Sequence, residues 1–544
     1  MADQIMAEGK AKKPGLLRRS MWGIWVILLT ALLVLSFIFA APWKVITLIA
    51  IFLVAATILP RIYRKWFWLA VGLVVLSFIV WIFLPDDNKG WRPYTFDKEL
   101  AQLQARYAVP DSENAAIIYN QILADWKQKE ANEPNLPECW YNLALKGPWL
   151  NKDQPEIAAY IQCHRNEIEA LLRATKIEKC SFPIDSSSFT DFLEARADLL
   201  IASGNNDAAE GNTSEAVEKY LAALELGQHV RQQLESKFNF ACEATGLGGI
   251  NNIVVLGDAN EFYLDKLEQA VSAIRYDWNS DFLDSITLDK LRLKNELGSS
   301  FYEVNPKGNV RLIRGSSAKS AKSRENLRKK LAVSTIDNPE TKAKLQKLTT
   351  EPGYWQRKFI KAYLQFYVPA TPEKLGKLVD ASFEKYYAMA KPDFKWSGKP
   401  DRVSIFQFQF IIDFRWLIQL HTSINKEVYF RIHDHYLRKS AEQRGTLLLI
   451  AMRRYKNANG HWPDSLDDVK TLVSAETFID PMNNGSLVYK RTDDGFTLYG
   501  KGKNGIDDGG KGYSNAEDKG EPDDLMIWPT RNKIPKQQEQ KANE

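Results

Sequence analysis

The sequence predicts a mainly helical, membrane-anchored protein with three N-terminal transmembrane helices, a helical repeat-like extracytoplasmic domain and a small α+β C-terminal module with a three-stranded antiparallel sheet. Three observations predict this class. Uncharged apolar runs crowd residues 22–84, apolar residues recur at helical spacing through much of 95–455, and short alternating strands with turn residues follow near the C-terminus. The chain has 544 residues, which favours several folded units over one core.

The membrane-anchor prediction rests on three apolar runs within residues 21–86, at 22–40, 45–59 and 66–84. A span needs about 20 apolar residues, and tryptophans stand near the ends of these runs, as interfacial residues do. The second run is short, and it reaches span length only by including residues 41–43.

Basic residues set the predicted orientation. They concentrate in the tail at 1–20 and between the second and third runs, which predicts a cytoplasmic N-terminus in a bacterial inner membrane. With three spans, everything after residue 86 is expected in the periplasm. If only two runs insert, the large domain stays in the cytoplasm.

The charge of the whole chain excludes little beyond nucleic acid. Its net charge of +5 comes from 72 basic and 67 acidic residues, a balance that does not indicate a nucleic-acid binder. Positive charge is concentrated in a predicted exposed loop and linker at 301–350, chiefly over residues 311–330. We predict contact there with anionic lipid or an acidic envelope polymer, with a solvated loop as the alternative.

The region 90–300 is predicted to be a helical repeat-like domain, with a helical continuation at 351–440. The segments 114–123 and 215–224 place Ala, Tyr and Leu at the same offsets, as in one helix of a tetratricopeptide-type hairpin. An irregular helical domain is the alternative. Four cysteines lie in this region, and an oxidising compartment would allow disulfides among them or leave them as buried thiols: Cys139, Cys163, Cys180 and Cys242.

Sequence motifs favour a protein that is not an enzyme. No nucleophile elbow, P-loop or zinc-protease motif is present in the sequence. His433 and His435 flank Asp434, but residues two apart on a helix point to different faces, whereas a helical metal pair needs a spacing of three or four. A hidden carboxylate pair, or a site at His433 and His435, remains the enzymatic alternative.

The residues from 441 to 530 predict the C-terminal module, which precedes a polar tail at 531–544. A long helix ends near Tyr455, Asn459-Gly460 turns the chain, and Asp-Pro at 480–481 leads to two alternating strands, SLVYKR and FTLYG. A loop with six glycines follows at 498–512, and Asp523-Asp524 precede a closing strand.

This order of motifs, from 444 to 528, resembles the globular domain of the major pseudopilins of type II secretion systems. The whole chain also resembles a family of membrane-anchored bacterial proteins in which helical domains precede such a module. The first of these resemblances implies a calcium ion at the glycine-rich loop, with Asn504 and Asp524 at matching positions. Three further candidates lie nearby, at Asp507, Asp508 and Asp523.

Two departures weaken the calcium inference and leave a metal-free turn as the alternative. Asn504 stands where the family has Asp, and the insertion after Gly512 is longer than the family's. A third departure concerns function, because the chain lacks the prepilin-peptidase glutamate, so a filament subunit is not expected. The sequence predicts a cell-envelope scaffold that binds other proteins, with an envelope hydrolase or an accessory component of a secretion system as alternatives.

Overall fold

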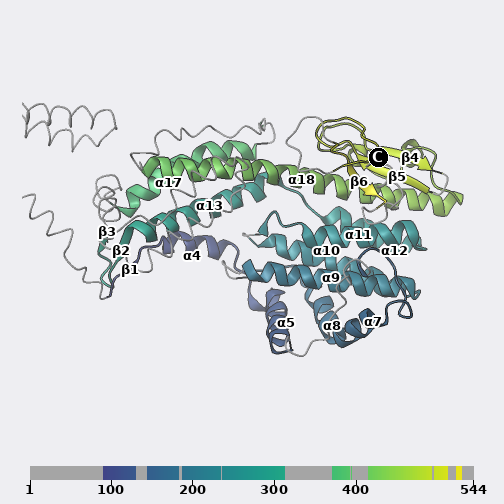
Figure 1. The fold of residues 1–544 in the computed structure, drawn as a ribbon, viewed down its shortest axis with the longest axis horizontal. Coiled ribbons are helices and arrows are strands. Elements are labelled where there is room, and N and C mark those ends of the chain that lie inside the picture. The colour runs from purple at the N-terminus through teal and green to yellow at the C-terminus, as the bar shows by residue number, and fades with distance from the viewer. Residues whose placement is uncertain are drawn as a thin grey trace, which may run out of the picture. The chain divides into compact units, whose positions relative to one another are not determined.

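The computed structural model describes residues 90–129, 144–182, 187–233, 236–312, 371–391, 394, 414–492, 495–512 and 522–529. This part of the chain is mainly helical, with two separate three-stranded antiparallel sheets (Figure 1). It forms two compact units. The first unit contains the described residues within 90–95, 293–312, 371–382 and 414–423, and the second contains the rest.

One part of the predicted fold class needs correction, namely the membrane anchor. Over the described ranges, no helix has the length and apolar character required to cross a membrane. The physical reason is visible in the sequence, because most of the longer described helices carry charged side chains every few positions, and the more apolar α11 (Ala241–Leu256) is too short to span. The three predicted spans at 22–40, 45–59 and 66–84 lie outside the described residues. The described structure therefore supports a mainly helical protein with small antiparallel sheets and does not support three transmembrane helices.

The first unit is built on the sheet β1-β2-β3. Strands β1 (Arg92–Pro93), β2 (Tyr302–Val304) and β3 (Val310–Leu312) are antiparallel neighbours in that order. Across the sheet, Arg311 binds the carboxylate of Glu303 at 3.1 Å and covers the ring of Trp91, 4.0 Å from its centroid. The unit also includes the end of α13 (Trp278–Phe301) and the start of α17 (Pro372–Tyr387).

The described part of the second unit begins with eight helices in chain order. They are α4 (Asp97–Arg106), α5 (Ala116–Lys129), α7 (Pro155–Cys163), α8 (Arg165–Ala174), α9 (Ser187–Ala209), α10 (Thr213–Gln232), α11 (Ala241–Leu256) and α12 (Glu261–Ala273). We call α9, α10 and α11 the helical array. The Tyr residues at matching offsets in the two similar segments, Tyr119 of α5 and Tyr220 of α10, are both fully buried.

Small residues let the array helices approach closely. A Cβ on Gly249 of α11 would lie 2.6 Å from the ring of Tyr220, and a Cβ on Gly227 of α10 would lie 2.7 Å from the backbone nitrogen of Glu243. Contacts this short leave no room for a side chain at either glycine. These two glycines therefore allow α10 and α11 to pack closely together.

The C-terminal module follows α18 (Phe414–Asn459). Gly460, with φ +80°, ends the helix, and Ser465 and Asp468 form a capping box around the short 3-10 helix Leu466–Val469. A second 3-10 helix covers Ala475–Phe478. Strands β4 (Val488–Thr492), β5 (Gly495–Gly500) and β6 (Leu525–Trp528) then form an antiparallel sheet in the order β4-β5-β6.

The module shares one core with several helices of the second unit, α5 and α8 to α12. A single cluster of buried apolar side chains runs from Ala115 through the array to Leu448–Met452 of α18 and on to Trp528 of β6. Gly445 of α18 faces Ile527 so closely that a Cβ would lie 2.4 Å from its Cδ1. The sheet therefore packs on one side of α18, as Figure 1 shows.

Candidate functional site

The glycine-rich loop at 500–512 leaves β5 and returns close to the residues that precede β6. Its start is fixed by Asn483, whose side-chain nitrogen donates to the carbonyl of Gly502 at 2.6 Å and to the carboxylate of Asp480 at 3.0 Å. Asp480 is fully buried, and it also accepts a hydrogen bond from the backbone of Met482 at 2.9 Å. The Asp-Pro turn predicted from the sequence therefore anchors the loop.

Two of the five predicted calcium ligands, Asn504 and Asp507, form hydrogen bonds or ion pairs with other residues of the module. Asn504 accepts a hydrogen bond from the backbone of Ile506 at 2.7 Å, which closes a local turn. Asp507 accepts the hydroxyl proton of Tyr499 at 2.6 Å and pairs with Lys490 at 3.1 Å. The hydrogen bond from Tyr499 is the larger cause and the contact with Lys490 the second, and together they lower the pKa of Asp507 to about 2. Asp507 is thus bound to the β4-β5 hairpin.

The other three predicted ligands gather where the loop meets residues 523–524. Asp508 accepts from the backbone of Asp523 at 3.3 Å, and Asp523 accepts from the backbone of Lys503 at 2.9 Å. Asp524 is fully buried and accepts from the backbone of Gly510 at 2.7 Å, while its second oxygen has no hydrogen-bond partner among the described residues. Burial raises the pKa of both Asp523 and Asp524.

These carboxylates do not form a calcium cage in the described structure. Calcium requires about six to eight oxygens around one point. Among the residues that the structure describes, no group of three or more His, Cys, Asp or Glu side chains could hold a metal ion. Each of Asp508, Asp523 and Asp524 instead accepts a different backbone N–H. The calcium ion stays a prediction, and residues 513–521 of the same connection lie outside the described residues.

Charged side chains from α18 and from the loop meet at the same place. Asp434 of α18 pairs with Lys503 of the loop at 2.6 Å and with Arg438 at 3.1 Å. The Arg438 guanidinium lies 3.7 Å from a carboxylate oxygen of Asp523. Sequence reasoning missed Arg438 and Lys503, which lie far apart in the chain. The available local signal was the spacing of four residues between Asp434 and Arg438 on one helix.

Of the two neighbouring histidines, His433 packs against an aromatic ring, whereas His435 is exposed on α18. The ring of His433 meets the ring of Trp278 edge to face, 4.7 Å between centroids. Burial, with help from the charge of Lys503, lowers the pKa of His433 to about 4, and burial also lowers the pKa of His435. The contact of the neutral His433 ring with the ring of Trp278 is a packing contact. The side chain of His421, the other histidine nearby in sequence, lies outside the described residues.

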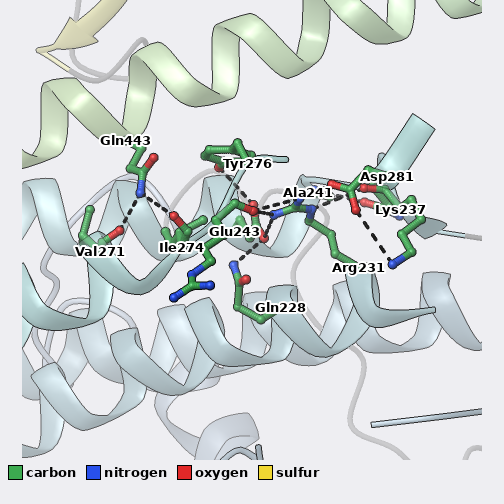
Figure 2. A network of polar contacts seen from close by, with 12 residues as sticks. Gln228, Arg231, Lys237, Ala241, Glu243, Val271, Ile274, Tyr276, Asp281 and Gln443 are labelled. Carbon is green, nitrogen blue, oxygen red and sulfur yellow. Dashed lines mark hydrogen bonds and ion pairs between the residues drawn. The ribbon is translucent and has the colours of Figure 1, made fainter. Parts of the chain in front are cut away.

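Two buried carboxylates do converge elsewhere in the second unit, on one arginine (Figure 2). Arg231 of α10 binds Glu243 of α11 at 3.1 Å and Asp281 of α13 at 2.8 Å. Glu243 also accepts from Gln228 at 2.5 Å and from the hydroxyl of Tyr276 at 3.1 Å. Burial raises the pKa of Glu243, and the nearby Arg231 opposes that shift.

This network, which we call the Arg231 network, is closed to substrate. The Glu243 side chain has no exposed surface, and that of Arg231 is only 7% exposed. The guanidinium carbon also lies over the rings of Phe240 and Tyr276, 5.1 and 4.9 Å from their centroids. A general acid or base must reach its substrate, so the arrangement is suited to joining helices.

A second set of polar contacts fastens α18 to the neighbouring helices. Gln443 donates to the carbonyls of Val271 and Ile274 at the end of α12, at 2.7 and 2.8 Å (Figure 2). Arg453 donates to the carbonyls of Val254 and Val255, the latter at 2.7 Å, where α11 ends. These side chains bind carbonyls at the ends of α12 and α11, where intrahelical donors run out; the carbonyl of Val271 also accepts from the backbone of Ile274 at 3.3 Å.

Arg454 adds an ionic contact on the surface beside Arg453. It meets three carboxylates of α12, those of Glu268 at 2.5 Å, Asp265 at 2.6 Å and Glu261 at 3.2 Å. Two of these carboxylates are more than half exposed, so the contact is screened by solvent.

The structure describes only some of the residues in the predictions for the cysteines and for the basic segment 311–330. Cys163, Cys180 and Cys242 are free thiols, the first exposed and the other two buried, and Cys139 lies outside the described residues. Burial raises the pKa of Cys180 and Cys242. Of the basic segment 311–330, only Arg311 and Leu312 are described, and Arg311 is paired with Glu303.

Comparison with known proteins adds no further evidence. No protein-family model, no curated protein and no solved structure matches this chain. The pseudopilin-like resemblance therefore rests on the motifs of residues 444–528 and stays a prediction.

Proposed function

We propose that this protein is a non-enzymatic scaffold that binds other proteins, and that its helical array and its C-terminal module act as one rigid body. The observation that carries the proposal is the continuous apolar core from Ala115 to Trp528. A module attached by a linker would have a core of its own and would move independently. Here a partner could contact both parts at once without an ordering cost between them.

The polar contacts of α18 support the same proposal. Gln443 and Arg453 bind backbone carbonyls at the ends of α12 and α11, while on its other side Gly445 meets β6. Interactions on both sides of one helix fix the orientation of the sheet relative to the helices that α18 touches. The Arg231 network is buried, which favours a structural role for its carboxylates over a catalytic one.

Exposed apolar side chains offer a place to test for partners. Leu256 at the end of α11 and Phe262 near the start of α12 are 49% and 60% exposed. We expect the tagged full chain, captured from its native cells after cross-linking, to retain the same partner proteins in repeated experiments. A Phe262→Ser variant with unchanged circular dichroism should lose some of them, whereas Lys152→Ser, at an exposed charged position, should not.

One result would contradict the scaffold proposal, and another would favour the hydrolase alternative. Recovery of the protein alone, at cross-linker concentrations that trap known complexes in the same cells, would show that it presents no partner-binding surface. Hydrolysis of an envelope polymer by the purified chain, abolished by Glu243→Gln without loss of stability, would favour the hydrolase alternative.

A secretion-accessory role is the second candidate. It is favoured by one observation, the packing of a three-stranded antiparallel sheet on the end of a long helix, in the chain order that the resemblance implies. Co-purification with secretion components would distinguish it from a scaffold with other partners. Capture of partners that include no such component would exclude this second candidate alone.

A further inference from the structure

Four charged side chains form a closed group between α18 and the glycine-rich loop. Asp434 and Arg438 come from α18, Lys503 comes from the loop, and Asp523 precedes β6. Arg438 is 6% exposed, so its charge is held in the interior. Such a charge is costly to bury unless opposite charges surround it.

The group is electrically balanced. The charge of Asp434 disfavours ionisation of Asp523, and Arg438 and Lys503 supply one positive charge for each of the two carboxylates. Arg438 reaches both carboxylates, at 3.1 and 3.7 Å. Lys503 reaches Asp434 through its ammonium group and Asp523 through its backbone N–H at 2.9 Å. The loop is therefore joined to α18 by alternating charges.

The backbone geometry keeps Asp523 in this position. Gly502 has φ +60° and packs directly on the Asp523 carboxylate, where a Cβ would overlap it. A loop residue with a side chain could not approach so closely. The side chain of Asp523 thus lies between Gly502 on the loop and Arg438 on α18.

We infer that Arg438 and Lys503, cations of the chain itself, hold the glycine-rich loop against α18 in the role that the resemblance assigns to a bound calcium ion. This inference concerns the module and does not depend on the scaffold proposal. Asp507 fits it as well, because Lys490 neutralises that carboxylate. A divalent cation placed beside Asp523 would be repelled by Arg438 and Lys503, and these two side-chain cations already lie next to the carboxylates of Asp434 and Asp523.

Hydrogen–deuterium exchange of the full chain tests the inference, because it reports on the loop separately from the remaining fold. In the wild type, we expect the exchange of peptides covering 500–512 to be the same in calcium and in chelator. In Arg438→Met and in Lys503→Met, we expect those peptides to exchange at least about tenfold faster. Peptides from α10 should keep their wild-type rate, which shows that the variant is folded.

Two further variants serve as matched controls. Lys470→Met removes an exposed cation of the same module, paired with Asp467 away from the loop, and should leave the exchange of 500–512 unchanged. Arg438→Lys keeps the positive charge and should restore part of the protection. If Arg438→Met does not fold, Lys503→Met, at a more exposed position, carries the test.

Two results would overturn the inference. One is wild-type loop exchange that slows in calcium and recovers in chelator. The other is an unchanged exchange rate in both Arg438→Met and Lys503→Met. Calcium-dependent protection that appears only in the double variant would support it, because the metal would then replace the missing side-chain cations.

Discussion

The guanidinium of Arg231 and the carboxylate of Glu243 lie 3.1 Å apart in the interior, and together they join α10 to α11. Removing this cation would take away the ion-pair partner of the buried Glu243 and leave Asp281 with Lys237, 3.8 Å away. We expect Arg231→Met to lower the free energy of unfolding by about 3–5 kcal/mol, measured by urea denaturation.

An exposed ion pair is the control for that experiment. Lys176 and Glu218 lie 2.9 Å apart with side chains that are 68% and 49% exposed. Lys176→Met should cost no more than about 1 kcal/mol. Equal effects of the two substitutions would mean that burial does not set the importance of the Arg231 network.

Neighbouring glycines of α11 should respond in opposite directions to alanine. A Cβ at Gly249 would lie 2.6 Å from the ring of Tyr220, whereas a Cβ at Gly248 would meet nothing within 4 Å. We expect Gly249→Ala to destabilise the fold by about 1–3 kcal/mol through overpacking. Gly248→Ala should stabilise it by about 0.5–1 kcal/mol, because Ala is the better helix former. Denaturation midpoints of the two variants check the prediction, and a loss of stability in Gly248→Ala would contradict it.

The adjacent arginines of α18 should differ in importance. Arg453 is 4% exposed and donates to backbone carbonyls, and its guanidinium lies 5.0 Å from the centroid of the Trp462 ring. We expect Arg453→Met to cost about 2–4 kcal/mol, because the carbonyls at the end of α11 lose charged donors. Arg454→Met removes contacts to exposed carboxylates and should cost about 1 kcal/mol, decreasing as salt is added. Thermal unfolding at low and high ionic strength separates the two, and the reverse ranking would contradict the assignment.

His229 should make the protein less stable in mild acid. Its Nδ1 lies 2.8 Å from the hydroxyl of Tyr119, and burial lowers the pKa of His229 to about 4, although the carbonyls of Ile177 and Glu178 oppose this. Between pH 6.5 and 4 the unfolded chain therefore binds a proton that the folded chain does not. The stability contributed by the neutral ring is present above pH 6.5 and is lost as the pH falls toward 4.

The measurement is the difference in unfolding free energy between the wild type and His229→Gln across this range. We expect the wild type to lose at most about 3 kcal/mol more than the variant between pH 7 and 4. Taking the difference removes the opposite contribution of carboxylates such as Glu243, whose pKa is raised. His461→Gln, at an exposed position, is the control, and its unfolding free energy should change with pH as that of the wild type does. Parallel curves for wild type and His229→Gln would contradict the prediction.

Thiol labelling should distinguish the cysteines. In a Cys139→Ser background, we expect iodoacetamide to modify the exposed Cys163 in the folded protein, and Cys180 and Cys242 only after unfolding. The reason is that reaction requires an accessible thiolate, whereas burial raises the pKa of both interior thiols. Rapid labelling of Cys242 in the native protein would contradict this placement.

Local sequence signals account for much of the C-terminal module. Alternating apolar residues around the turn predicted β4 and β5, and Asn459-Gly460 predicted the end of α18, where Gly460 adopts a positive φ. Each of these signals lies within a few residues of the structure that it predicts. The length of α18 was not predicted, because the segment 406–420, which is followed by the turn-like residues 421–423, is interpreted from sequence as a separate buried helix with a possible strand at its start.

Contacts between distant residues explain most of what the sequence could not predict. The candidate ligands Asp507 and Asp523 were recognised, but Lys490 and Arg438, which neutralise them, come from a strand and a helix outside the loop. The same holds for Arg231 and Asp281, which are 50 residues apart. Spacing along the chain identifies neighbours on one helix or strand, and tertiary packing decides which charges meet.

The position of β4 at the edge of its sheet has a consequence for solubility. An edge strand presents unpaired backbone groups to which a strand of another molecule can add, and such addition leads to aggregation. On β4 the consecutive side chains Lys490 and Arg491 are both about half exposed. The same edge of a second molecule carries the same two basic side chains, and like charges repel. Lys490 and Arg491, which pair with Asp507 and Asp464, therefore also disfavour pairing between the sheets of separate molecules.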